Sequence, residues 1–272
     1  MRLLLTSALA TTVSATGLIL PLYIYPAATW DDGAANWTPV FNAAESNLDL
    51  SWLTVVNPHN GPGDTHLPGN NDINYIQGVT KLNTHPNIKP IGYVRTNYAQ
   101  FSPDQVKQDV AAWKGWDTYS ASNISVQGIF FDESAPNAPY MRDVVGYTRA
   151  AFGRPITVTC NFGKAVSDEF YDICDVVVAF ESCLNCPGLP QYKDAATIQA
   201  NIPANRMGKA AVILNYFTGT AFDGTFADAT LVHRYFQTAK DMGLAWAYFC
   251  SQDYNELLAW PATIWEDVKA LS

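Results

Sequence analysis

The sequence has few charged residues, and the basic ones are the scarcer kind. Lys and Arg number 16 against 25 Asp and Glu, so the formal net charge is −9. A surplus of negative charge repels phosphate groups, which argues against nucleic acids and anionic membrane surfaces as partners. A neutral or cationic ligand is compatible with this charge.

Long apolar runs are also missing. Beyond the N-terminus no stretch approaches the roughly 18 consecutive apolar residues of a membrane-spanning helix, so we expect no membrane span. Residues 1–15 combine one positive charge, a short apolar run and small residues up to Ala15. That order is typical of a secretory signal peptide cleaved near Ala15. We therefore expect residues 16–272 to form the mature protein, at the cell surface or in the extracellular space.

Cysteine is absent before Cys160. The cysteines and two glycosylation sequons both bear on whether the protein is secreted. An oxidising compartment would permit up to two disulfides among the five cysteines, and Cys183 with Cys186 is the pair we expect. A lone Cys-x₂-Cys without a nearby His is poor evidence for zinc. Two N-glycosylation sequons, Asn36-Trp37-Thr38 and Asn123-Ile124-Ser125, agree with a eukaryotic secretory route. The cysteines are Cys160, Cys174, Cys183, Cys186 and Cys250.

Several motifs that mark other enzyme classes are absent. The sequence has no Gly-x-Ser-x-Gly elbow of a serine hydrolase and no His-Glu-x-x-His of a zinc protease. No Gly-x-Gly-x-x-Gly follows the first apolar run, which counts against dinucleotide binding. His59, Asp64 and His66 form only a loose cluster around a Gly-Pro-Gly turn. We therefore expect neither a metal nor an organic cofactor.

The chain is apolar enough to bury a large core, and its pattern alternates strand and helix. Hydrophobic residues make up 48% of the sequence, and eight short apolar runs each precede an amphipathic stretch. Eight such units predict one α/β domain, a (β/α)₈ TIM barrel, and we expect it to be a monomer; an open doubly wound sheet is the alternative. The expected strands are 18–25, 52–57, 88–95, 126–132, 155–161, 174–181, 207–215 and 243–250, and the expected helices are 37–48, 72–83, 103–116, 138–152, 165–173, 193–204, 226–241 and 254–271.

Polar and aromatic residues mark the carboxyl ends of the expected strands, where barrel enzymes carry their sites. The sharpest signal is Gly128-Ile129-Phe130-Phe131-Asp132-Glu133, in which two acids follow a buried strand. Successive strand residues face opposite sides, so one acid is expected to be chemical and the other supporting. The strand-end residues are Tyr23, Tyr25, Asn57, His59, Tyr93, Arg95, Asp132, Glu133, Asn161, Glu181, Asn215, Tyr216 and Tyr248.

Glu181 supplies a second carboxyl group in a comparable place, at the end of an apolar run two strands further on. Neighbouring strands lie about 4.8 Å apart, so inward carboxylates on the fourth and sixth strands can reach the roughly 5 to 9 Å separation of glycoside hydrolases. That chemistry needs one ionised and one protonated carboxyl group. The pair of Asp132 and Glu181 therefore predicts cleavage of sugar linkages.

Several segments resemble the spherulin-4 family of fungal and bacterial cell-surface proteins, also called glycoside hydrolase family 135. The resemblance runs in order through nearly all of the mature chain. The fifth strand end, Thr159-Cys160-Asn161-Phe162-Gly163, departs from the Asn-Pro-Gly expected there. The segments that carry the resemblance are Leu20-Pro21-Leu22-Tyr23-Ile24-Tyr25-Pro26, Val56-Asn57-Pro58-His59-Asn60-Gly61-Pro62-Gly63, Ile91-Gly92-Tyr93-Val94-Arg95-Thr96-Asn97-Tyr98, Gly128-Ile129-Phe130-Phe131-Asp132-Glu133 and Phe180-Glu181.

The resemblance implies a (β/α)₈ barrel that cleaves internal α-1,4 linkages in N-acetylgalactosamine-containing polysaccharide, such as the galactosaminogalactan of mould cell walls and biofilms. It implies Asp132 as nucleophile, Glu181 as general acid/base and Glu133 as a supporting charge, in a reaction that retains the anomeric configuration. The candidate substrate-binding residues are Tyr23, Tyr25, Asn57, His59, Tyr93, Arg95, Tyr98, Asn161, Tyr216, Trp246 and Tyr248.

Two other functions compete with hydrolysis. Strand-end carboxylates can grip sugars without cleaving them, so a carbohydrate-binding barrel without turnover is the first alternative. A polysaccharide deacetylase is the second, but it would use a metal held by Asp and closely spaced His residues, and that spacing is missing.

Overall fold

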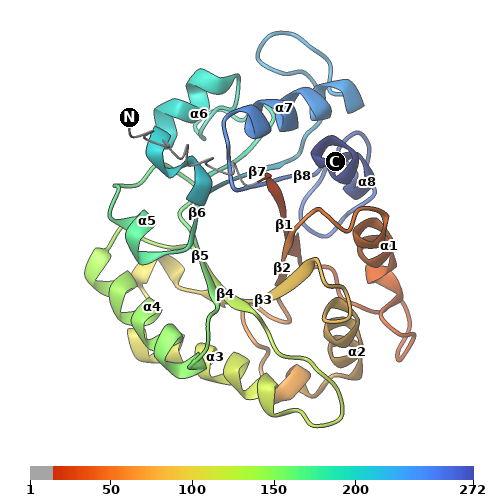
Figure 1. The fold of residues 1–272 in the computed structure, drawn as a ribbon, viewed down its shortest axis with the longest axis vertical. Coiled ribbons are helices and arrows are strands. Elements are labelled where there is room, and N and C mark those ends of the chain that lie inside the picture. The colour runs from red at the N-terminus through yellow and green to blue at the C-terminus, as the bar shows by residue number, and fades with distance from the viewer. Residues whose placement is uncertain (1–14) are drawn as a thin grey trace, which may run out of the picture.

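The computed structural model describes residues 15–272, and they form a closed barrel of eight parallel strands surrounded by helices (Figure 1). The expected signal peptide lies outside the described residues except for Ala15. The strands are β1 (Gly17–Leu22), β2 (Trp52–Val56), β3 (Ile88–Arg95), β4 (Gly128–Asp132), β5 (Thr157–Asn161), β6 (Val176–Cys183), β7 (Ala210–Asn215) and β8 (Trp246–Phe249).

Eight α-helices within the described residues alternate with these strands and cover the outside of the barrel (Figure 1). The predicted (β/α)₈ TIM barrel is therefore confirmed, and the open sheet is excluded because β1 pairs with both β2 and β8. The helices are α1 (Thr38–Ser46), α2 (Ile73–Leu82), α3 (Pro103–Gly115), α4 (Ala138–Phe152), α5 (Phe170–Ile173), α6 (Ala195–Asn201), α7 (Ala229–Asp241) and α8 (Ile264–Leu271).

The core has two layers, one inside the barrel and one between the strands and the helices. All six residues of β1 and all five of β2 are buried, as parallel strands covered on both faces require. Capping groups fix the helix starts: Ser102 forms a capping box with Gln105 at the start of α3. Asp228 accepts from the Leu231 backbone N–H at the start of α7.

The last helix departs from its predicted boundaries, and the difference matters for the site. The sequence pattern predicts the last helix over 254–271, but α8 begins at Ile264, after the N-cap Thr263. Pro261 lacks a backbone N–H and is unsuited to a helix interior, and residues 250–263 form a loop at the carboxyl end of β8. This loop brings Tyr254 to the barrel mouth.

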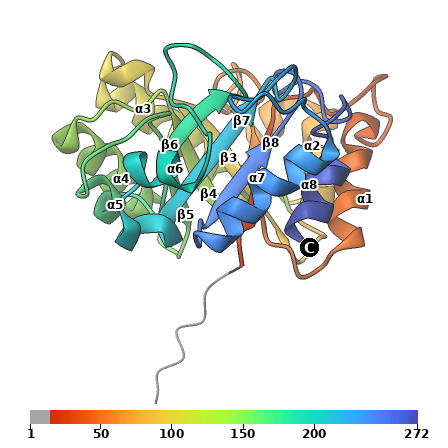
Figure 2. The same ribbon diagram turned by 90° about the horizontal axis from the view of Figure 1, so that it is seen from above.

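Two disulfides close segments in the second half of the chain. The expected pair Cys183–Cys186 is present, and Cys160 on β5 pairs with Cys174 just before β6. Cys250 remains a buried thiol. Among residues 15–272, none of the helices combines the length and apolar character that crossing a bilayer requires. The loops at the carboxyl ends of the strands gather at one face of the barrel, at the top of Figure 2.

Candidate active site

Asp132 and Glu181 meet at the mouth of the barrel, held together by Asn161. Asp132 is the last residue of β4, Asn161 is the last residue of β5, and Glu181 lies on β6. The side-chain Nδ2 of Asn161 donates to Asp132 Oδ1 and to Glu181 Oε2, at 2.7 Å in each case. The two oxygens that it joins are therefore no further apart than twice that distance, so both carboxyl groups can act on one sugar linkage.

A β-bulge turns Glu181 into the barrel. Asn161 pairs with Val178 in register, so strict alternation would next place Phe180 and Ser182 inside. The register between β6 and β7 shifts between Val178 and Phe180, which inserts one extra residue. Phe180 accordingly faces the helix layer, with its ring 6.1 Å from that of Tyr192, and Glu181 faces the interior.

Asp132 is half-buried at the cleft and accepts two side-chain hydrogen bonds. Tyr93 Oη donates to Asp132 Oδ2 at 2.6 Å, and Asn161 donates to the other oxygen. Burial raises the pKa of Asp132 above its ordinary value, while the bonds from Tyr93 and Asn161 oppose that rise. Two donors aimed at one carboxyl group favour its ionised form, as a nucleophile requires.

Glu181 is half-buried as well and accepts from Tyr254, a residue that the sequence pattern does not place at the site. Tyr254 Oη donates to Glu181 Oε1 at 2.5 Å, and Asn161 donates to Oε2. Burial raises the pKa of Glu181, and the charge of Asp132 raises it further. The charge of a neighbouring carboxylate favours the protonated form of Glu181, which a general acid needs.

The amide of Asn161 is oriented by its own oxygen. Gly163 N–H donates to Asn161 Oδ1 at 3.0 Å, so the Nδ2 hydrogens must face the two carboxylates. Gly163 has a φ of +63° and lies close to Glu181, since a Cβ on it would stand 3.6 Å from Glu181 Cβ. The β5 loop therefore follows a glycine turn despite its departure from the expected Asn-Pro-Gly.

Tyr23 packs between the two tyrosines that bond the carboxylates. Its ring meets Tyr93 and Tyr254 edge to face, with centroids 5.6 Å apart in both pairs. Burial raises the pKa of Tyr23 well above the ordinary tyrosine value, so it stays a neutral phenol. The packing of Tyr23 fixes the two tyrosines that bond Asp132 and Glu181.

Glu133 lies beside Asp132 because the chain leaves the strand there. Its φ is +51°, a left-handed conformation that ends the alternation of β4 and lets both acids line the mouth. Arg95 Nε donates to Glu133 Oε2 at 2.8 Å. Thr96 and Tyr98 hold this turn, because their backbone N–H groups donate to the carbonyl oxygens of Asp132 and Glu133.

These side chains surround a cleft of about 250 Å³ at the barrel mouth. Tyr98 stands at its lip with a φ of +54° and 61% of its surface exposed. A second cavity of about 440 Å³, walled by the loop after β6, shares Tyr98, Gly163 and Glu181 with the first. The two form one groove that passes over the carboxylates and suits an extended ligand. The cleft is lined by Tyr98, Asp132, Glu133, Asn161, Phe162, Gly163 and Glu181.

Four predicted binding residues lie on the same face but outside the cleft. Tyr25 donates to Asp72 at 2.8 Å, and Tyr216 is 53% exposed on the loop after β7. Asn57 Oδ1 accepts from the Gly61 backbone, which orders the loop after β2. His59 pairs with Asp64 at 2.7 Å at the surface.

The predictions for Trp246 and Tyr248 as groove residues are wrong. Trp246 is the first residue of β8, at the amino end of the barrel, where its ring packs against Gly17. Tyr248 is 1% exposed and packs inside the barrel. Strand β8 runs only from Trp246 to Phe249, so Trp246 lies at the end of the strand away from the mouth.

The loose cluster of His59, Asp64 and His66 does not assemble. His59 pairs with Asp64, whereas His66 Nε2 lies 3.6 Å from Asp109. Within residues 15–272, no three His, Cys, Asp or Glu side chains are placed to share a metal ion.

Comparison with known proteins agrees with the resemblance found in the sequence. The model of the spherulation-specific family 4 matches residues 17–271. Spherulin-4 of Physarum polycephalum is 28% identical over 175 residues, which are 63% of this chain and 46% of that protein. The match thus spans about half the length of this relative.

Solved structures share the barrel. Aspergillus clavatus Sph3, crystallised in complex with GalNAc, has a TM-score of 0.72 and 24% identity, covering 95% of this chain and 98% of that one. A GH18 chitinase from Pseudoalteromonas aurantia has a TM-score of 0.53 and 10% identity, covering 94% and 98%. At these identities the likeness shows the fold, which is a glycoside hydrolase-like barrel.

Proposed function

The chain belongs to the spherulation-specific family 4, and we propose that it is an endo-acting glycoside hydrolase of galactosamine-type polysaccharide. The observation that carries this proposal is the shared donor of Asp132 and Glu181, since Asn161 Nδ2 lies 2.7 Å from both. Two half-buried carboxyl groups this close do not both ionise readily. Glycoside cleavage uses one ionised and one protonated carboxyl group.

The reaction assigned to this pair is a double displacement with retention. Asp132 attacks the anomeric carbon while Glu181 donates its proton to the departing glycosidic oxygen. Glu181 then takes a proton from water, whose oxygen displaces Asp132 from the sugar. Tyr93 and Tyr254 keep the two carboxyl groups in place, and Glu133, held by Arg95, lines the cleft.

The polymer assigned as substrate contains α-1,4-linked N-acetylgalactosamine and galactosamine. The Sph3 structure holds GalNAc in a protein of the same fold, which supports an amino sugar in the cleft. The open groove over Tyr98 and Glu181 favours cleavage within a chain over removal of its end. The net charge of −9 suits a polymer that carries some free amines.

The test is digestion of purified galactosaminogalactan and other α-linked polymers by the wild type and by Asp132→Asn. We expect oligosaccharides of several lengths from galactosaminogalactan with the wild type and none with Asp132→Asn, analysed by mass. Wild-type inactivity on every polymer would remove the assignment of a hydrolase. Binding of the polymer without product would then identify a carbohydrate-binding barrel.

A further inference from the structure

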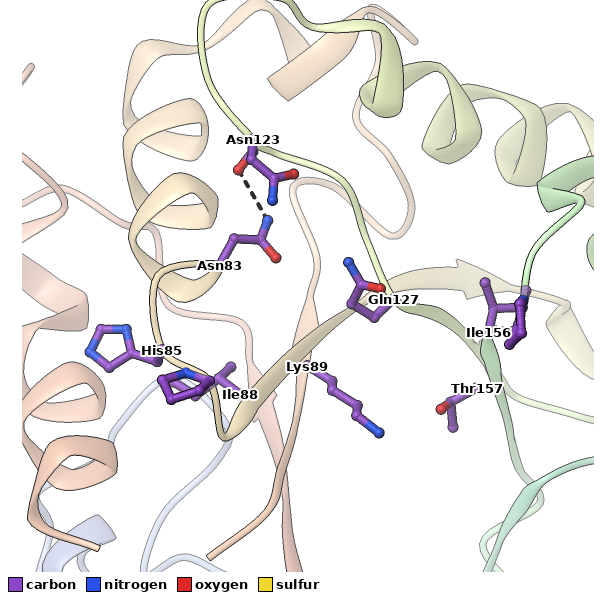
Figure 3. A pocket seen from close by; sticks show the side chains of 10 residues that line it. Asn83, His85, Ile88, Lys89, Asn123, Gln127, Ile156 and Thr157 are labelled. Atoms are coloured by element: carbon purple, nitrogen blue, oxygen red, sulfur yellow. Dashed lines mark hydrogen bonds between the residues drawn. The ribbon is translucent and has the colours of Figure 1, made fainter. Parts of the chain in front are cut away.

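A second polar pocket lies at the amino ends of β3, β4 and β5, opposite the carboxylates (Figure 3). Its volume of about 460 Å³ falls within the roughly 300 to 1,000 Å³ of small-molecule sites. Polar groups of Asn83, Lys89, Gln127 and Thr157 face apolar ones of the neighbouring strand ends. The lining residues are Asn83, His85, Pro86, Ile88, Lys89, Asn123, Gln127, Pro155, Ile156 and Thr157.

Asn123, the acceptor of one sequon, forms part of this pocket. Its Oδ1 accepts from the backbone N–H and the hydroxyl of Ser125, at 3.1 and 2.5 Å. The amide nitrogen is thereby turned the other way, and Figure 3 shows it on the side facing Asn83 and the pocket. Among residues 15–272 this nitrogen has no hydrogen-bond partner, and the residue is exposed.

The other sequon is built differently. The Nδ2 of Asn36 donates to the Tyr25 carbonyl oxygen at 3.1 Å, and the residue is half-buried. Its neighbour Trp37 is fully buried, with its indole N–H bonded to the Ile24 carbonyl oxygen. A glycan on Asn36 would stand at the loop after β1, and Asn36 lines neither this pocket nor the two cavities at the barrel mouth.

We propose that Asn123 is an N-glycosylation site whose first sugar rests in the pocket lined by Lys89 and Gln127. In the transfer, Asn123 Nδ2 forms a bond to C1 of an N-acetylglucosamine and loses a proton. The C1–O bond to a lipid-linked diphosphate donor breaks, and the diphosphate leaves with the electron pair. The proposal is independent of the hydrolase function, because this pocket lies at the other end of the barrel.

The pocket suits the innermost sugar. The Lys89 ammonium and the Asn83 Oδ1 have no hydrogen-bond partner among residues 15–272, and they supply a donor and an acceptor for sugar hydroxyls and the acetamido group. Ile88, Pro155 and Ile156 offer apolar surface to the ring face. The glycan would shield strand ends without obstructing the catalytic mouth.

Occupancy is tested by secreting the chain from a eukaryotic host with the host's own leader peptide. Peptide mass mapping after enzymatic deglycosylation should find the glycan at Asn123 and little or none at Asn36. Asn123→Gln and Ser125→Ala should abolish the mass shift, whereas Ser125→Thr and Asn36→Gln should keep it. A secreted chain without glycan, or with glycan only at Asn36, would overturn the site.

Seating of the first sugar is tested by the melting temperature after trimming the glycan to one N-acetylglucosamine. We expect the trimmed protein to melt roughly 2 to 4 °C above Asn123→Gln. In a chain of this size, that difference in melting temperature corresponds to about 1 kcal/mol in the free energy of unfolding. Lys89→Ala should remove most of that difference while leaving the unglycosylated protein nearly unchanged, because Lys89 is exposed. An equal difference in the Lys89→Ala background would show that the sugar lies in solvent.

Discussion

Asp132 and Glu181 share a single hydrogen-bond donor, the side-chain amide nitrogen of Asn161, at 2.7 Å from each. Each carboxyl group also has its own tyrosine, Tyr93 for Asp132 and Tyr254 for Glu181. The arrangement couples the two titrations, because ionisation of either group raises the pKa of the other.

Tyr254→Phe should shift the alkaline limb of the pH–rate profile to higher pH. The phenol donates to the ionised form of Glu181 and so lowers its pKa, and its loss raises that pKa. Glu181 must be protonated to act as the acid, so activity should persist to higher pH. Tyr93→Phe is the matched control, because loss of this phenol raises the pKa of Asp132. Asp132 must be ionised to act as the nucleophile, so this variant should shift the acid limb of the profile to higher pH instead. Identical shifts in both variants would contradict the two roles.

Asn161→Ala should lower kcat by about 10² to 10³, the loss that removal of one oxyanion-hole donor causes in other hydrolases. The reason is positional as well as electrostatic, because both carboxyl groups lose their common anchor. Steady-state kinetics on a defined oligosaccharide gives the value, and circular dichroism checks the fold. A kcat within a factor of two of the wild type would show that the shared bond has no part in catalysis.

Asp132→Asn should stabilise the protein at neutral pH. Burial raises the pKa of Asp132 in the folded protein. The contribution of this group to the free energy of unfolding is therefore fully present below the ordinary carboxyl pKa, near pH 4, and is lost as pH rises through the folded-state pKa. The neutral amide avoids that loss, and we expect a gain of about 1 kcal/mol at pH 7. Urea unfolding of both proteins at pH 7 and pH 3.5 measures it. The difference should shrink at the lower pH, and a larger difference there would reverse the argument.

Tyr98→Ala should raise KM for the polymer about tenfold and leave kcat largely unchanged. The ring stands exposed at the lip of the cleft, where it can stack on a sugar, and a stacking contact of roughly 1 to 1.5 kcal/mol corresponds to that factor. Such a contact is made equally in ground and transition states. Tyr98→Phe keeps the ring and should keep KM. If kcat falls instead of KM rising, Tyr98 acts on the reacting groups.

Sequence patterns are sufficient to predict the barrel and to place the three acids at its mouth, and the reason is physical. A residue such as Asp132 at the end of an otherwise apolar run has to leave the packed layers, and parallel strands bring all such ends to one face. The apolar runs are short and bounded by polar loops, so the number of strands can be counted from the amino-acid sequence alone.

Other parts of the site depend on contacts that no local pattern reports. Glu181 faces inward only because β6 carries a bulge, and nothing in Val176–Cys183 announces an extra residue. The amphipathic pattern places Tyr254 in a helix, because it gives no reason to begin that helix as late as Ile264. The pattern does not report how deep a strand residue lies in the barrel, so it misplaces Trp246, which begins β8, and Tyr248, which is buried.

The most direct test of the paired carboxylates is the rate of reducing-end release from galactosaminogalactan by four proteins: the wild type, Asp132→Asn, Glu181→Gln and the double variant. When two groups act as one unit, removing either one removes most of the catalysis. The rate of each single variant should therefore be on the order of 10⁴-fold below that of the wild type, and the rate of the double variant hardly lower still. Losses that multiply in the double variant, or a wild-type rate in either single variant, would contradict the account.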